Sequence, residues 1–89
     1  MRRRHVFRGR VQGVGFRATT CELATRFQVG GFVRNQADGT VEVVVDGLPD
    51  EIEAFIAAIE ARFTGKIRGC DVTDQAILDP PEPEFVIRY

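Results

Sequence analysis

The chain has 89 residues and a formal net charge of −1 at pH 7, so its length allows one domain, residues 1–89, and not two. Apolar residues make up 44% and charged residues 28%, which is an ordinary mixture for a soluble globular protein. The near-neutral charge argues against a general nucleic-acid-binding protein, because such proteins usually carry a strong basic excess.

The N-terminal region contains the one basic run, Arg2–Arg4, and no apolar stretch of signal-peptide length follows it. We expect this run to be a solvated end of the chain. Cys21 and Cys70 are the only cysteines, and we expect both to be reduced packing residues. These observations predict a cytoplasmic protein that binds no membrane.

The first half of the chain predicts a strand, a glycine-rich loop and a helix. Alternating apolar residues indicate a strand over His5–Val11, and a helix is expected from about Ala18 to Gln28. The residues that recur at helical spacing are Thr20, Leu23, Ala24 and Phe27. Gly30–Gly31 then ends this element, because glycine commonly stops helices.

The second half predicts a hairpin, a second helix and two further strands. Strands are expected over Phe32–Asn35 and Thr40–Val45, joined by an Asp38–Gly39 turn. A helix begins within Leu48–Glu51 and ends at Thr64–Gly65. Its apolar stripe consists of Ile52, Phe55, Ile56, Ile59 and Phe63. The remaining elements are a strand within Lys66–Leu78, a proline connector over Pro80–Pro83 and a final strand over Phe85–Tyr89.

This order of elements predicts an α+β protein with the ferredoxin-like, split βαβ (βαββαβ) sandwich. Both crossover helices must cover the same side of the sheet. We therefore expect an antiparallel sheet with two helices on one face, and an additional terminal strand.

The loop between the first strand and the first helix has the composition of a phosphate-binding site. Gly13 and Gly15 permit backbone conformations that turn several N–H groups toward one point. The helix that follows adds partial positive charge at its N-terminus. Arg17 supplies a planar guanidinium group that matches phosphate oxygens. Together these residues predict a small cradle for a phosphate-sized dianion.

The sequence lacks the residues that other classes of phosphate-binding or phosphate-cleaving protein use. No Gly-x-x-x-x-Gly-Lys-Ser/Thr motif is present, the loop has no cysteine, and no His, Cys or acidic cluster has metal-ligand spacing. We therefore expect no metal and no cofactor. Asn35 follows Arg17 by eighteen residues, which allows one helix and a return to the loop. Its side-chain amide can hold a water molecule by donating and accepting hydrogen bonds.

Three segments of the chain resemble the acylphosphatase family. Gly9–Arg17 is similar to the first signature of that family, and Gly31–Asn35 with Asp38–Val41 is similar to the second. Phe85–Tyr89 resembles the usual C-terminal strand. The resemblance covers nearly the whole chain, in order and at the family's length.

The resemblance implies a hydrolase that cleaves the carboxyl–phosphate bond of small acyl phosphates, releases inorganic phosphate, and needs no metal or cofactor. It implies that Arg17 is the phosphate-binding catalytic arginine and that Asn35 orients the nucleophilic water. The loop whose amides bind phosphate is Gln12, Gly13, Val14, Gly15 and Phe16. The family is often drawn with the bound phosphate accepting the proton of the water. We expect a monomer.

Two other functions compete with this interpretation. Similar domains begin the large hydrogenase-maturation carbamoyltransferases, so the chain is alternatively a phosphate-binding or accessory domain of a protein that uses carbamoyl phosphate. RNA-recognition domains share the order of elements, but they stack bases on aromatic residues of central strands. Thr40–Val45 has no aromatic residue, and the net charge is −1, so we do not favour RNA binding.

Several charged and aromatic residues have simpler interpretations than catalysis. We interpret His5 as a partly buried strand residue and not as a base. Arg8, Arg10 and Arg34 either widen a positive field around the site or are solvated charges, and we favour solvated charges. The phenylalanines expected in the core are Phe7, Phe27, Phe32, Phe55 and Phe63.

Overall fold

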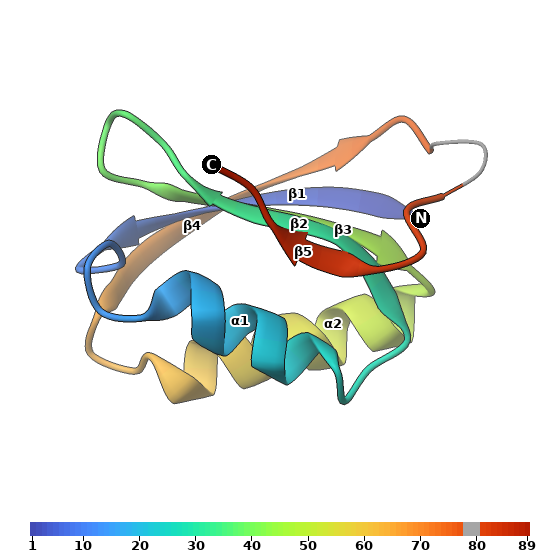
Figure 1. Ribbon diagram of the computed structural model, residues 1–89, viewed down its shortest axis with the longest axis horizontal. Helices are drawn as coiled ribbons and strands as arrows, with labels where there is room; N and C mark the ends of the chain where they lie inside the picture. Colours follow the sequence, from blue (N-terminus) through green and yellow to red (C-terminus); the bar gives the residue numbers. More distant parts are fainter. Residues whose placement is uncertain (78–80) are drawn as a thin grey trace.

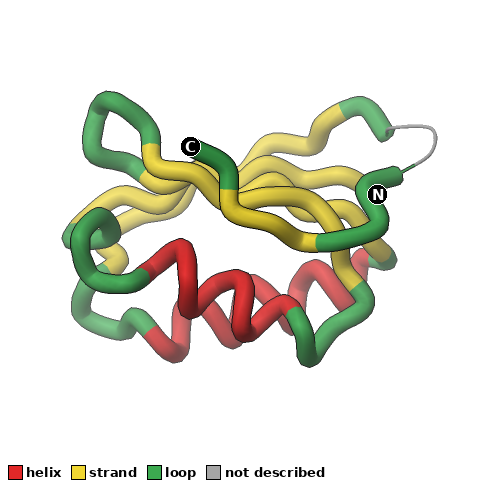
Figure 2. The backbone as a smooth tube through the Cα atoms, in the orientation of Figure 1, coloured by secondary structure: helices red, strands yellow, loops and turns green. Residues whose placement is uncertain are grey.

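The computed structural model describes residues 1–77 and 81–89. The elements are β1 (Arg2–Gly9), α1 (Phe16–Ala24), β2 (Val29–Asn35), β3 (Val41–Gly47), α2 (Pro49–Arg62), β4 (Ile67–Gln75) and β5 (Phe85–Ile87). Figure 1 and Figure 2 show two layers, with both helices beneath one face of the sheet. The predicted βαββαβ sandwich is therefore confirmed. The predicted fourth strand region ended at Leu78 and the connector began at Pro80, and both residues lie outside the described chain.

The sheet has the strand order β4-β1-β3-β2-β5. β1, β2, β3 and β4 pair in antiparallel fashion, and the predicted hairpin places Val33 opposite Val43 and Asn35 opposite Val41. β5 pairs with β2 in parallel, with Phe32 opposite Val86. The five-stranded sheet is therefore mixed, because the terminal strand joins the antiparallel set in the same direction as its neighbour.

The main hydrophobic core lies between the sheet and the helices. Val43 of β3 and Phe55 of α2 are completely buried there, as the valine alternation and the helical spacing predicted. Burying a side chain of this size contributes about 1.5–3 kcal/mol. The other buried members from these two elements are Val41, Val45, Ile52, Ile56 and Ile59. These contacts pack α2 against the sheet, and the loops at the ends of the sheet extend from this packed core.

The first helix is shorter than predicted and begins two residues earlier. α1 starts at Phe16, directly after Gly15, and ends at Ala24 instead of Gln28. The N–H groups of Arg26 and Phe27 donate to carbonyl oxygens three residues back, at 3.0 and 3.1 Å. These shorter-range bonds tighten and end the helix. In the described chain, neither helix combines the length and apolar character of a membrane span.

The N-terminal arginines belong to the sheet, which makes the prediction of a solvated end wrong. Arg2 lies in β1 directly opposite Asp46 of β3, and its Nη1 lies 3.1 Å from Asp46 Oδ2. Both side chains are more than nine-tenths buried. Because register pairs Arg2 with Asp46, the arginine is held by a carboxylate that lies 44 residues further along the chain.

Phe32 is buried, but on the face of the sheet that the helices do not cover. It lies outside the helix-side core, and arginines surround its ring. The guanidinium carbons of Arg2, Arg34 and Arg88 lie 6.0, 5.7 and 4.2 Å from the ring centroid. The arginines therefore cover an aromatic side chain that the sequence placed in the core.

Candidate active site

The loop between β1 and α1 has the backbone that its glycines predict. Gly13 and Gly15 adopt φ values of 76° and 78°, in the left-handed region. A Cβ atom added at either position would meet no atom within 4 Å. Conformation, and not lack of space, therefore favours glycine at both positions.

The start of α1 is left open toward the loop. Gly15 occupies the N-cap position, where no side chain makes a capping hydrogen bond, and the first turn contains no acidic residue. The first helical bond runs from the Thr19 N–H to the Gly15 carbonyl oxygen, at 3.0 Å. The N–H groups of Phe16, Arg17 and Ala18 therefore lack acceptors within the helix. Free N–H groups and the helix dipole favour an anion at this point.

A cavity of about 240 Å³ brings the start of α1 together with the end of β2. Arg17, from the first turn of the helix, and Asn35, the last residue of β2, both line it. The complete lining is Val11, Gly13, Gly15, Phe16, Arg17, Ala18, Asn35, Ile87 and Tyr89. Residues eighteen positions apart in sequence thus face one small cavity, as the spacing predicted.

Two predicted loop residues lie beside this cavity without lining it. The side chain of Gln12 donates hydrogen bonds to two carbonyl oxygens of the β2–β3 turn. Val14 is half-buried against the hydrophobic core. The backbone of these two residues continues the loop, but their side chains hold it in place.

The C-terminal segment contributes two lining residues that the sequence did not single out. Ile87 of β5 and Tyr89 both face the cavity. The guanidinium carbon of Arg17 lies 5.0 Å from the centroid of the Tyr89 ring, which is a cation–π distance. The sequence signal was the resemblance of Phe85–Tyr89 to the family's C-terminal strand, which assigns no chemical role to Ile87 or Tyr89.

Among the described residues, the carboxylate, imidazole and thiol side chains lie outside this cavity. None of the residues that line the cavity is Asp, Glu, His or Cys. Burial, and secondarily the charge of Arg3, lowers the pKa of His5 to about 4. Burial raises the pKa of Cys70 to about 11 and also raises that of Cys21, and both thiols are free. His5 is buried as a strand residue, and the cysteines are poor thiolates.

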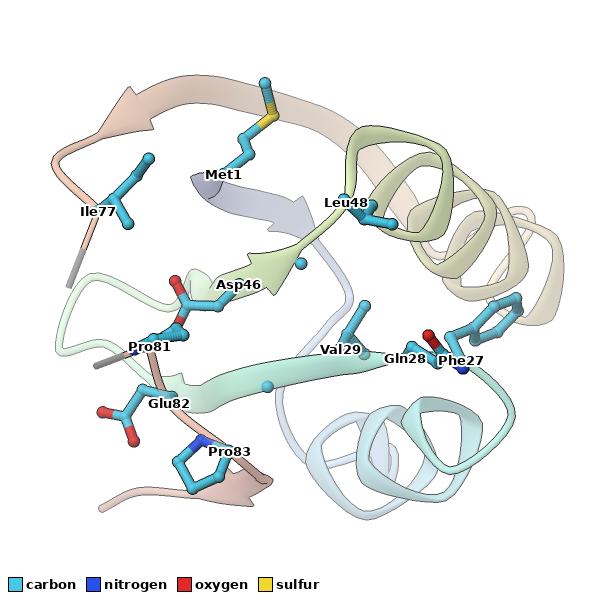
Figure 3. Close-up of a pocket in the computed structure, with 12 residues that line it drawn as sticks. Met1, Phe27, Gln28, Val29, Asp46, Leu48, Ile77, Pro81, Glu82 and Pro83 are labelled. Atoms are coloured by element: carbon cyan, nitrogen blue, oxygen red, sulfur yellow. The ribbon is translucent and has the colours of Figure 1, made fainter. Parts of the chain in front are cut away.

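A larger cavity, about 560 Å³, lies at the opposite end of the sheet. Figure 3 shows it between Met1, Leu48 and Ile77, with Asp46 and Glu82 on one side. Both carboxylates are already paired with arginines. Its apolar and acidic lining is unsuited to a phosphate dianion, so size alone does not identify the site. Among the described residues, no group of three or more His, Cys, Asp or Glu is placed to hold a metal ion.

Comparisons with known proteins identify relatives of this chain. The Acylphosphatase family model matches residues 3–87. An acylphosphatase of Synechococcus sp. is 44% identical over 87 residues, covering 94% of this chain and 89% of the relative. The crystal structure of acylphosphatase from Bacillus subtilis superposes with a TM-score of 0.88 and 31% identity, covering 99% and 98% of the two chains.

A likeness to a larger protein also exists. The crystal structure of HypF from T. kodakarensis matches with a TM-score of 0.84 and 27% identity, covering 100% of this chain but 12% of that one. The family model spans nearly all of this chain, and the Synechococcus and Bacillus relatives have nearly its length. The chain therefore belongs to the acylphosphatase family, whose enzymes hydrolyse acyl phosphates.

Proposed function

We propose that Arg17 and the loop amides bind the phosphoryl group of a small acyl phosphate, while Asn35 orients the attacking water. The supporting observation is the shared cavity, which Arg17, the open start of α1 and Asn35 all line. The guanidinium group and the amides of Gln12–Phe16 contact the phosphate oxygens. The Asn35 amide accepts a hydrogen bond from the water and leaves its oxygen facing phosphorus.

The proposed reaction is a single displacement at phosphorus. The water oxygen forms the new P–O bond while the bond between phosphorus and the carboxyl oxygen breaks, and the carboxylate leaves with the electron pair. The proton of the water passes to an oxygen of the phosphoryl group, consistent with a cavity whose described lining has no Asp, Glu or His. Positioning and electrostatic stabilisation supply the acceleration, as is common in phosphoryl transfer. Products are the carboxylate and inorganic phosphate.

Hydrolysis of benzoyl phosphate, followed by its ultraviolet absorbance with EDTA present, tests this proposal. Asn35→Ala should lower kcat on the order of a hundredfold, because the water loses its orientation. Inhibition by inorganic phosphate should change little in that variant. Arg17→Ala should weaken phosphate inhibition about tenfold or more, since a charge-assisted hydrogen bond is lost.

The controls are Arg26→Ala, which removes an exposed arginine beyond the end of α1, and Gln28→Ala, which removes an exposed side-chain amide. Both should retain wild-type kinetics. Equal loss of turnover and phosphate affinity in Asn35→Ala would assign Asn35 a structural role. An inactive but folded wild type would instead favour the accessory role that the likeness to HypF raises.

A further inference from the structure

The side chain of Gln12 links the phosphate loop to the turn that follows Asn35. Its Nε2 donates to the carbonyl oxygens of Gln36 and Thr40, each at 2.8 Å. Both hydrogens of the amide group are therefore engaged, and both acceptors belong to the backbone of the β2–β3 turn. Figure 1 shows this turn and the loop after β1 at the same end of the sheet.

The turn that receives Gln12 is stabilised by its own hydrogen bonds. The Gln36 N–H donates to the Thr40 carbonyl oxygen at 2.9 Å, and the Gly39 N–H donates to the Gln36 carbonyl oxygen at 3.1 Å. The Thr40 N–H donates to Asp38 Oδ1 at 3.0 Å. Hydrogen bonds from Thr40, the hydroxyl first, hold the pKa of Asp38 below its usual value. The two acceptors of Gln12 are thus fixed relative to β2.

We propose that Gln12 is a positioning residue, which sets the distance between the bound phosphate and the water held by Asn35. This inference rests on the proposed function. The loop holds the phosphate and the strand end holds the water, so the two halves of the site belong to different elements. Gln36 directly follows Asn35, and Gln12 is the first residue of the proposed phosphate-binding segment Gln12–Phe16. A displacement of about 1 Å between reacting groups can reduce a rate a hundredfold.

Gln12→Met tests the link, because methionine has a similar length and no donor. The side chain of Gln12 is exposed, so the variant should fold. We expect kcat for benzoyl phosphate to fall about tenfold, while the inhibition constant of inorganic phosphate changes less than twofold. Gln28→Met is the matched control, since Gln28 is exposed at the other end of the sheet, and it should behave as wild type.

A double-mutant cycle with Asn35→Ala separates positioning from a general structural role. Rates are measured with enzyme in excess and spontaneous hydrolysis subtracted. If Gln12 acts through the position of the water, Gln12→Met should change the rate of Asn35→Ala by less than twofold. An equal loss in both backgrounds, or a loss of phosphate affinity as large as the loss of kcat, would overturn the inference and leave the proposed function intact. If the single variant Asn35→Ala turns over at the wild-type rate, both the inference about Gln12 and the proposed role of Asn35 are wrong.

Discussion

At the scale of single residues, Gly15 joins the β1–α1 loop to the helix that follows. It lies at the N-cap of α1 with φ 78° and ψ 19°, where an L-residue with a side chain is strained. This conformation directs the start of α1 toward the cavity that contains Arg17. The geometry of the candidate site thus depends on the backbone conformation of a residue that has no side chain.

Gly15→Ala should cost about 1–2 kcal/mol of strain and weaken phosphate inhibition, because alanine resists the left-handed conformation. Gly15→Asn should be milder, since asparagine enters that region more readily. Open space around the position excludes a steric clash as the cause. Urea unfolding and phosphate inhibition measure the two effects. Identical behaviour of the alanine, asparagine and wild-type proteins would show that φ at this position is unimportant.

At the scale of elements, a charged cluster joins three strands on the face that the helices leave open. Glu42 of β3 accepts hydrogen bonds from the Nε groups of Arg4 in β1 and Arg34 in β2. Its carboxylate is 6% exposed, whereas the arginines are 31% and 45% exposed. Glu42 is therefore the partner that is removed from water, and the two arginines supply the hydrogen bonds that compensate its buried charge.

Glu42→Gln should destabilise the fold by about 1–3 kcal/mol, because two arginines lose a buried acceptor of opposite charge. Asp71→Asn is the comparison, since Asp71 and Arg8 form a pair at 3.6 Å in which both side chains are mostly exposed. That change should stay within about 0.5 kcal/mol. Urea unfolding of both variants provides the measurement. Equal losses of unfolding free energy in the two variants would mean that the burial of Glu42 does not strengthen its ion pairs.

The sequence predicted the elements whose patterns are local and missed contacts between distant segments. The alternation in β3 and the apolar spacing in α2 were sufficient to place both elements. Arg2 was misplaced because its partner, Asp46, lies far along the chain. The cavity residues Arg17 and Asn35 were found from type and spacing. Tyr89 was not, because it enters the cavity only through the pairing of β5 with β2.

At the scale of the whole molecule, a buried histidine couples stability to pH. His5 is 4% exposed, and its Nδ1 has no hydrogen-bond partner among the described residues. Burial lowers its pKa from 6.5 to about 4. As pH falls below 6.5, the unfolded chain binds a proton that the folded protein does not accept until about pH 4. The effect of His5 on the free energy of unfolding is therefore absent above pH 6.5. As pH falls from 6.5 toward 4, the buried neutral histidine progressively lowers that free energy.

Between pH 7 and pH 4, wild-type protein should lose more stability than His5→Leu, by at most about 3 kcal/mol. Protonation of carboxylates such as Asp38, whose pKa is lowered, also destabilises the folded protein in acid, but it does so equally in both proteins. The difference between the two unfolding curves therefore isolates the histidine. Parallel curves over this range would contradict the assignment.

Within residues 1–77 and 81–89, Arg17 contacts an aromatic ring and forms no ion pair with a carboxylate. The ring of Tyr89 lies against the guanidinium group without cancelling its charge. Arg8 and Arg34, by contrast, are paired with carboxylates, and the molecule as a whole carries −1. Because the net charge is close to zero, we expect only a weak long-range field to steer an anion through solution. If the proposed function holds, we expect the acyl phosphate to be captured at short range, at the mouth of the cavity, and kcat/KM to vary little with ionic strength.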